Sequence, residues 1–189
     1  MYVVYTVKGV VRIPPEMFQM PLNEAAEIIV EENFIGYVHP DIGIIVGVFD
    51  IKIEEMGKLV PGDAGSYHNV EFKVLAFKPL EKEVVEGFIT GATQRVLAFV
   101  SLGPVDGIIH ISQIADEELE YDPQRVAFLG KKTGRILERG DIVRARIIAV
   151  SLPNEPTRRP RIALTMRQPF LGKIEWIKEE VERIEKHAG

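Results

Sequence analysis

The side chains of this chain that could do chemistry are mostly cationic, and they gather in one part of the sequence. Between Arg125 and Arg167 there are eleven Lys or Arg residues and only three Asp or Glu residues, so this window carries +8. The formal net charge of the whole chain is −5, which leaves −13 on all other residues. Such a separation suggests one surface for a polyanion and another for protein. The alternative is that these cations only solvate a loop.

A catalytic site or a metal site finds little support in the sequence. The chain has no cysteine, and its four histidines stand singly, without a partner at metal-ligand spacing. Residues 130–133, Gly-Lys-Lys-Thr, lack the upstream glycine of a nucleotide-binding loop. Asp63 lies among glycine and proline residues, and we interpret it as a turn former that bonds its own backbone. We expect no catalytic residue, no metal and no cofactor in this chain.

The composition is that of a folded protein outside the membrane. Hydrophobic residues make up 46% of the chain and charged residues 27%. No apolar run approaches the roughly 20 residues of a membrane span, and the N-terminus lacks the basic lead of a signal peptide. We therefore expect a cytoplasmic protein, in agreement with the absence of cysteine. The many Ile, Val, Glu and Arg residues are also typical of a thermophile.

Five short β-like runs separated by turns follow one another in the second half of the chain. They cover residues 84–89, 98–100, 103–114, 139–143 and 161–167. The third run ends on His-Ile-Ser. Five strands of this kind can form an OB barrel. The blocks and their order resemble the RNA-binding OB-fold domain named after ribosomal protein S1, so we predict an all-β barrel over residues 81–168.

The predicted barrel places cations where they could follow a phosphate backbone. OB folds bind single strands by stacking bases on aromatic side chains while cationic side chains contact the phosphates. Strand alternation puts Arg144 and Arg146 on one face, opposite apolar residues. The Phe-Gly pair that S1 domains carry before Ala-Phe-Val is replaced here by Val96 and Leu97, so we expect a modest, largely electrostatic RNA affinity. The candidate RNA-binding residues are His110, Lys131, Lys132, Arg144, Arg146, Arg161 and Arg167.

Two further helices are expected in this half. The long connection 115–138 contains an acidic stretch, residues 116–120, that we interpret as a short helix. Connections of this length are usually functional or disordered. An apolar stripe with helical spacing predicts an amphipathic helix over residues 171–186, within a C-terminal segment 169–189. The stripe consists of Ile174, Ile177, Val181 and Ile184.

The first 80 residues mix strand and helix patterns. The expected elements are a strand over residues 2–13, a helix over 22–34, and strands over 44–53 and 68–76. Gly36 stands where the glycine after a helix belongs. In the second strand, alternation places Phe49 on the same face as Ile45 and Ile51. The order β-α-β-β predicts a small α+β domain, of a truncated ribonucleoprotein-like type, over residues 1–80.

Segments of both halves point to one family. Residues 13–16 read Ile-Pro-Pro-Glu, residues 61–70 read Pro-Gly-Asp-Ala-Gly-Ser-Tyr-His-Asn-Val, and residues 164–177 contain Met-Arg-Gln-Pro and Glu-Trp. These segments resemble the E-prime subunits of archaeal RNA polymerase, the counterparts of the seventh subunit of RNA polymerase II. The resemblance spans essentially the whole chain. Phe170 departs from a glycine usual in this family.

The resemblance implies a stalk subunit of DNA-directed RNA polymerase that carries no catalytic residue of its own. Its first domain is expected to pair with a small helical partner, the F subunit of the polymerase, and to insert the loop of residues 57–66 into the polymerase core. The second domain is expected to contact nascent single-stranded RNA. The candidate core-contacting residues are Gly57, Lys58, Leu59, Pro61, Gly62 and Asp63.

Two other interpretations remain open from the residues alone. One is an exosome-type or translational RNA-binding adaptor that carries the same OB domain. The other is a nuclease with this barrel as an accessory, which the scattered carboxylates disfavour. The adaptor does not explain the segment around Asp63 or the Trp176 block.

Overall fold

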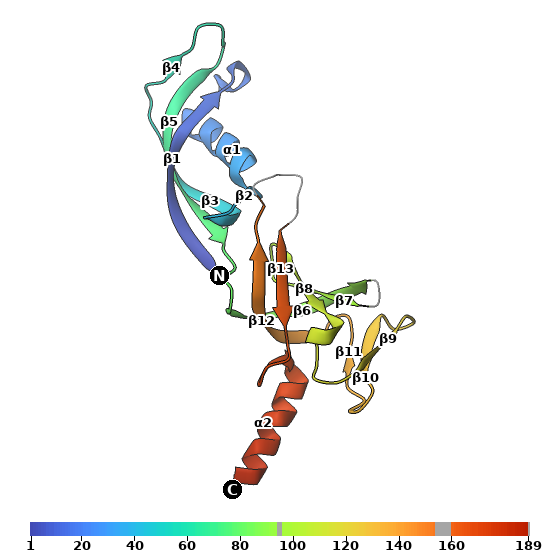
Figure 1. The fold of residues 1–189 in the computed structure, drawn as a ribbon. Helices are drawn as coiled ribbons and strands as arrows, with labels where there is room; N and C mark the ends of the chain where they lie inside the picture. The colour runs from blue at the N-terminus through green and yellow to red at the C-terminus, as the bar shows by residue number, and fades with distance from the viewer. Residues whose placement is uncertain (94–95, 154–159, 189) are drawn as a thin grey trace. The chain divides into compact units, whose positions relative to one another are not determined.

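The computed structural model describes residues 1–93, 96–153 and 160–188 (Figure 1). Its contacts divide the chain into two compact units. The first is built on Met1–Lys78, and the second on Pro79–Ser151 together with the C-terminal residues. Each unit has its own sheet and its own core, and they are described in turn.

The first unit is one antiparallel sheet with a helix on one face. Its elements are β1 (Tyr2–Ile13), η1 (Pro15–Met17), α1 (Leu22–Phe34), β2 (Val38–His39), β3 (Gly43–Ile53), β4 (Lys58–Leu59) and β5 (Ser66–Phe77). The strand order is β1-β5-β3-β2, and β4 pairs with β5. The helix packs its buried Ala25, Ile29 and Val30 against Phe72 and Val74 of β5. The α+β class expected from the sequence is confirmed.

Strand alternation decides which side chains form this core. β1 and β5 pair along their whole length, from Tyr2 opposite Phe77 to Ile13 opposite Ser66. On β5 every second residue from His68 to Ala76 is buried, as the sequence pattern predicts. Gly36, after the helix, has a φ of +84°, a conformation that glycine adopts without strain.

β3 departs from the alternation that the sequence suggests. The pairing register with β5 shifts between Ile45 and Gly47 and again between Phe49 and Lys52. At the second shift Asp50 has a φ of +54°. A β-bulge adds a residue to one strand and so reverses the direction of the side chains that follow. Phe49 is therefore 40% exposed instead of lying on the core face, and the prediction for this residue is wrong.

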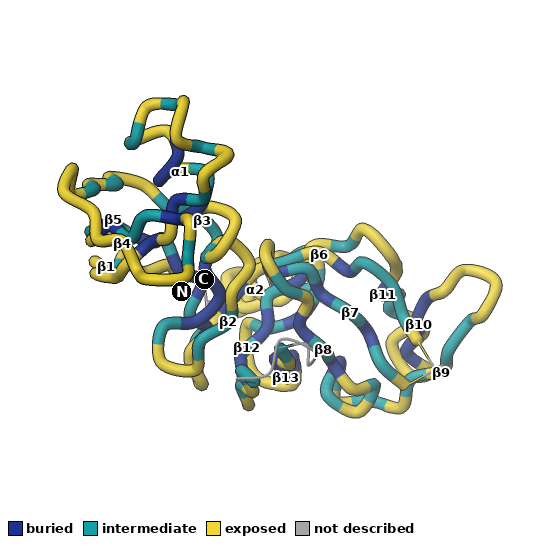
Figure 2. The backbone as a smooth tube through the Cα atoms, turned by 90° about the horizontal axis from the view of Figure 1, so that it is seen from above, coloured by how far each residue is buried: buried dark blue, intermediate teal, exposed yellow. Residues whose placement is uncertain are grey.

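The second unit is a closed β-barrel. Its strands are β6 (Val84–Thr93), β7 (Leu97–Ser101), β8 (Asp106–His110), β12 (Ile142–Ser151) and β13 (Arg161–Thr165). They pair in the order β13-β8-β7-β6-β12, and the pairing of β12 with β13 closes the barrel. Buried positions alternate with more exposed ones along these strands (Figure 2). The OB-type barrel expected from the sequence is confirmed.

The long connection between β8 and β12 has structure of its own. After η2 (Ile111–Gln113) it forms a small antiparallel sheet of β9 (Leu119–Asp122), β10 (Ala127–Gly130) and β11 (Ile136–Leu137). The expected acidic helix is therefore wrong, because its last residues belong to β9. Tyr121 lies opposite Phe128, with ring centroids 5.4 Å apart, and Phe128 is fully buried. This pairing of an aromatic side chain across two strands outweighs the local preference of the acidic residues for a helix.

The chain ends in α2 (Ile174–Ala188), which starts three residues later than expected. The residues before it form β14 (Gly172–Lys173), which pairs with β12. Of the predicted stripe, Ile177 is buried, whereas Ile184 is 50% exposed. The far half of the helix projects away from the barrel (Figure 1). No helix in the described part of the chain is long and apolar enough to cross a membrane.

Candidate docking loop and nucleic-acid interface

The loop expected to contact the polymerase core lies at one end of the sheet of the first unit, between β3 and β5 (Figure 1). Gly57, Lys58, Leu59, Pro61 and Gly62 are all exposed, and Asp63 is half-buried. Two apolar side chains of this loop face solvent, Leu59 at 76% exposure and Val60 at 45%, and so does Met56 directly before it, at 87%. The loop thus presents apolar side chains at a place where no core of its own unit covers them.

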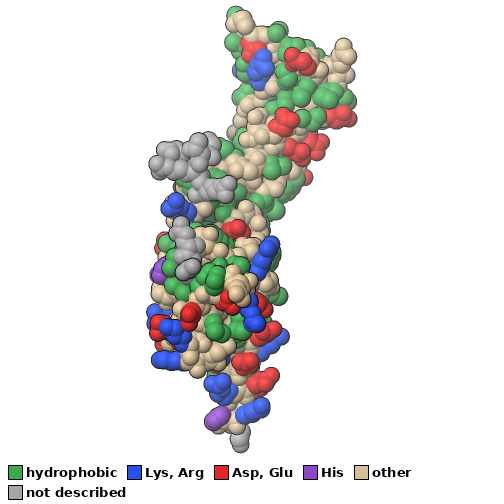
Figure 3. Space-filling view, turned by 90° about the vertical axis from the view of Figure 1, so that its right-hand side faces the viewer, with side chains coloured by type: hydrophobic (Ala, Val, Ile, Leu, Met, Phe, Trp, Pro, Cys, Tyr) green, Lys and Arg blue, Asp and Glu red, His purple; other side chains and the backbone are tan. Residues whose placement is uncertain are grey.

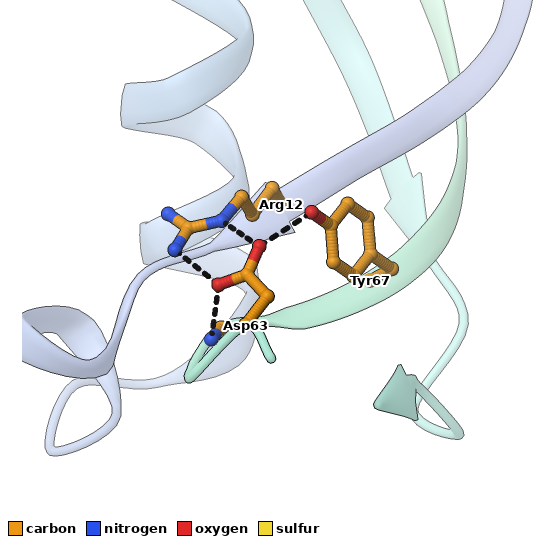
Figure 4. Close-up of polar contacts among 4 residues, drawn as sticks. Arg12, Asp63 and Tyr67 are labelled. Carbon is orange, nitrogen blue, oxygen red and sulfur yellow. Dashed lines mark hydrogen bonds and ion pairs between the residues drawn. The ribbon is translucent and has the colours of Figure 1, made fainter. Parts of the chain in front are cut away.

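Asp63 holds this loop to the neighbouring strands (Figure 4). Arg12 Nε donates a hydrogen bond to Oδ2 at 2.8 Å, and another Arg12 nitrogen donates to Oδ1 at 2.5 Å. The Tyr67 hydroxyl donates to Oδ2 at 2.6 Å, and the Gly65 amide donates to Oδ1 at 2.9 Å. The bond to Gly65 confirms that Asp63 bonds its own turn. The contacts with Arg12 and Tyr67 were not predicted from the sequence.

The electrostatics of this cluster favour the charged forms of Asp63 and Arg12 and the neutral hydroxyl of Tyr67. The Arg12 guanidinium first, and then the Tyr67 hydroxyl and the Gly65 amide, hold the pKa of Asp63 well below its usual range. The same carboxylate raises the pKa of Arg12 and that of Tyr67. The ion pair of Asp63 with Arg12 therefore persists through the neutral range, and the cluster keeps its geometry there.

The start of the loop is fixed by the buried His68. Its Nδ1 lies 2.9 Å from the Glu54 carbonyl oxygen, and its Nε2 lies 3.0 Å from Ser66 Oγ. Gly57 packs directly on the ring, because a Cβ atom added there would lie 2.5 Å from His68 Nε2. The loop is thus anchored at both ends, by His68 and by the Asp63 cluster.

On the barrel, His110 ends β8 with its ring exposed. Its Nδ1 accepts a hydrogen bond from the Ser112 amide at 3.2 Å and lies 2.8 Å from Ser112 Oγ. Because Nδ1 is an acceptor, the neutral ring carries its proton on Nε2. The side chain therefore offers one N–H donor and an exposed ring face to a ligand.

Three of the six other candidate RNA-binding side chains form ion pairs with acidic residues. Arg144 forms an ion pair with Glu86 at 2.7 Å, and Lys131 forms one with Glu118 at 2.7 Å. Arg167 pairs with Asp116 and also donates to the Ser112 carbonyl oxygen at 3.4 Å. On the face of the second unit that Figure 3 shows, Lys and Arg side chains lie among Asp and Glu side chains.

The remaining three candidates differ in their surroundings. Lys132 and Arg161 are exposed, and their side chains make no ion pair or hydrogen bond within the described residues. Arg146 is half-buried, and its Nε is buried without a hydrogen-bond partner among the described residues. The structure brings His110 and Arg167 together at Ser112, and it places Arg144 beside Arg146 on β12. Arg158, Arg159 and Glu155 of the basic window lie outside the described residues.

Comparisons with known proteins match both units. Residues 8–64 match the SHS2 domain found in the N terminus of Rpb7p/Rpc25p/MJ0397, and residues 78–155 match the S1 RNA binding domain. Over 186 residues the chain is 41% identical to DNA-directed RNA polymerase subunit Rpo7 of Sulfolobus acidocaldarius, covering 98% of this chain and 100% of that one. The chain belongs to the Rpo7 family of DNA-directed RNA polymerase subunits.

Two further relatives of the chain are also named as DNA-directed RNA polymerase subunits. The Rpo7 subunit of Saccharolobus solfataricus is 44% identical over 177 residues, covering 94% of this chain and 97% of that one. The DNA-directed RNA polymerase III subunit RPC8 of Saccharomyces cerevisiae is 28% identical over 193 residues, covering 98% and 90%. These matches support the polymerase subunit over the exosome-type or translational adaptor.

The structure shows how some cations of the basic window, residues 125–167, are paired. Among the described residues three cations of the basic window, Arg144, Lys131 and Arg167, are paired with acidic residues from outside that window. One cation contact was missed: the Arg135 guanidinium lies 5.5 Å from the Trp176 ring centroid. Among the described residues no group of three or more His, Asp or Glu side chains could hold a metal ion.

Proposed function

We propose that this polymerase subunit is a non-catalytic stalk subunit of the cytoplasmic transcription machinery. The loop of residues 57–66 docks on the polymerase core, the first unit pairs with the small helical partner, and the barrel contacts nascent single-stranded RNA. The proposal is supported by the Rpo7 relatives, by the S1 match and by the exposed apolar side chains of the docking loop.

Docking of this loop on the polymerase core is supported by apolar side chains that are exposed to solvent but held in a fixed position. Met56, Leu59 and Val60 are exposed, while Asp63 and His68 tie the loop to β1 and β5. Exposed apolar side chains that are held in one place mark protein interfaces. Because the loop is already ordered in the free subunit, it loses little conformational entropy when it binds the polymerase core.

Replacing Leu59 with Asp tests the docking role. We expect loss of co-purification with the polymerase core and an unchanged melting temperature, because the side chain is 76% exposed. Leu129→Asp, at a 40% exposed leucine of β10, is the matched control and should keep the core. Retention of the core by the Leu59 variant would place the docking surface elsewhere.

Pairing with the small helical partner is proposed for the first unit because its sheet keeps apolar side chains exposed on the face opposite α1. Val10 is 62% exposed and Val4 51% exposed, both on β1. Light scattering of the co-expressed pair should give a one-to-one complex, and the double change of Val4 and Val10 to Asp should abolish it. A complex that survives this change rules out this sheet face as the interface.

RNA contact by the barrel predicts a defined dependence on salt. Each neutralised phosphate of a single strand contributes about 0.7 to the slope of log affinity against log salt. Lys132 and Arg161 make no ion pair within the described residues, and changing both to Ala should therefore reduce that slope by about 1.4. Lys178→Ala with Lys186→Ala on α2 removes the same charge and should leave the slope unchanged. Equal changes of the salt slope in the two double variants would mean that Lys132 and Arg161 act through net charge and do not contact the RNA phosphates.

His110 is expected to act on a base rather than on a phosphate. Base stacking on a ring contributes about 1–3 kcal/mol. His110→Ala should therefore weaken RNA binding within that range while the salt slope stays constant, because stacking releases no counterions. A fall in slope would reassign His110 to the phosphate backbone.

A further inference from the structure

Three consecutive acidic residues in the connection after β8 each engage a part of the proposed RNA surface. Asp116 pairs with Arg167, which follows β13. Glu118 Oε1 lies 2.7 Å from Lys131 Nζ, at the turn after β10. Both cations belong to the candidate RNA-binding set, and both are paired with neighbours in one short segment.

Glu117, between them, occupies a backbone cradle. Its Oε2 accepts hydrogen bonds from the Lys132 amide at 2.9 Å and from the Thr133 amide at 3.1 Å. The Thr133 hydroxyl donates to Oε1 at 2.5 Å. Gly130 leaves room for this carboxylate, since a Cβ atom there would lie 2.5 Å from Glu117 Oε1. Consecutive backbone amides with a hydroxyl form the kind of concavity that binds phosphate oxygens.

We infer that residues 116–118 occupy phosphate positions of the RNA surface, so that the phosphates of a bound single strand displace the carboxylates of Asp116 and Glu118. The inference rests on the proposed RNA function. The S1 match, which does not depend on these contacts, points to the same ligand. The segment then acts as an internal competitor that keeps RNA binding weak and exchangeable.

Because both ion pairs are exposed to solvent, replacing their carboxylates with RNA phosphates costs little free energy. The side chains of Asp116 and Glu118 are 83% and 74% exposed, and those of Arg167 and Lys131 are 43% and 46% exposed. Ion pairs with this much solvent contact are weak. A phosphate that approaches Arg167 or Lys131 therefore needs to replace only a loosely held carboxylate.

The test compares two double variants of the full chain that lose the same charge. Asp116→Asn with Glu118→Gln frees Arg167 and Lys131. Asp106→Asn with Glu138→Gln is the control, because these exposed carboxylates make no ion pair or hydrogen bond within the described residues. Binding of a fluorescent single-stranded RNA is measured by anisotropy across a range of salt, after circular dichroism has verified the fold.

We expect the Asp116/Glu118 variant to bind RNA roughly 2- to 30-fold more tightly at low salt, given the modest strength of exposed pairs. The slope of log affinity against log salt should stay that of the unmodified chain, because bound RNA displaces both carboxylates there as well and the number of neutralised phosphates does not change. The control variant should keep the slope of the unmodified chain.

Equal tightening of RNA binding in both variants would overturn the inference, because only net charge would then matter. RNA binding by the unmodified chain without a gain in the Asp116/Glu118 variant would overturn it too, while the RNA function stands. Absence of RNA binding in all three chains would overturn the proposed RNA function and this inference with it.

Discussion

Asp63 shows how one carboxylate can organise a docking loop. It accepts hydrogen bonds from Arg12, Tyr67 and Gly65 at the same time, and Arg12 lies opposite Tyr67 in the pairing of β1 with β5. Its role as a turn former follows from its glycine and proline neighbours. The contact with Arg12, 51 residues away, depends on strand register, which no local pattern of residues reveals.

The low pKa of Asp63 predicts a defined acid sensitivity. A carboxylate with a depressed folded pKa adds stability that is complete above the unfolded pKa, about 3.9 for Asp, and is lost as pH falls toward the folded value. The unmodified chain should therefore melt at a higher temperature than Asp63→Asn near neutral pH, and this difference should shrink below about pH 4. Glu55→Gln, at an exposed acid nearby, should match the unmodified chain throughout. A pH-independent difference would assign the effect of Asp63 to shape alone.

Phe170 gives a second prediction at this scale. The residue has a φ of +60°, which is unfavourable for a bulky side chain, and the side chain is 46% exposed. The backbone at Phe170 is therefore strained, which it would not be with the glycine usual at this position. Phe170→Gly should raise stability by up to about 1 kcal/mol, the relief of a left-handed residue less the entropy of a glycine in the unfolded chain. Phe170→Ala keeps the strain and should bring no gain; urea unfolding midpoints of both variants decide the matter.

At the scale of elements, periodicity located the long strands and both helices but not the small sheet of the connection. β9 and β10 form because Tyr121 and Phe128 meet across strands, whereas the preceding acidic residues look helical in isolation. The bulges of β3 were equally hidden, since one inserted residue reverses a face without changing the residue types. Cation partners were missed for the same reason, as Glu86 reaches Arg144 only through the pairing of β6 with β12.

The exposures of the apolar stripe of α2 indicate which part of the helix packs against the protein. Ile177 is 7% exposed and Ile184 is 50% exposed, so the stripe packs only near its start. Ile177→Ala should lower the free energy of unfolding by about 2–4 kcal/mol, and Ile184→Ala by no more than about 0.5 kcal/mol. Chemical unfolding of both variants measures the difference. Equal losses would mean that the far half of the helix also packs against the protein.

For the whole molecule, the division into two units implies separable roles. The barrel is closed by pairing between its own strands, and the core of the first unit comes from its own sheet and helix. A fragment of residues 79–189 should therefore unfold cooperatively and bind RNA with the salt slope of the full chain, yet fail to join the polymerase core. Calorimetry and RNA titration of the fragment check this. An unfolded fragment would show that the barrel needs the first unit.

The order in which the barrel strands are joined has a consequence for synthesis. β8 pairs in parallel with β13, so that Ile108 lies opposite Ala163, far later in the chain. A ribosome must therefore produce β13 before the barrel can close, and until then β8 keeps an unpaired edge. Pairings between such distant segments form slowly, and an open edge invites association with other chains. The barrel thus matures later than the first unit, whose sheet is complete once Phe77 has been made, and it depends more on the speed of its final folding step.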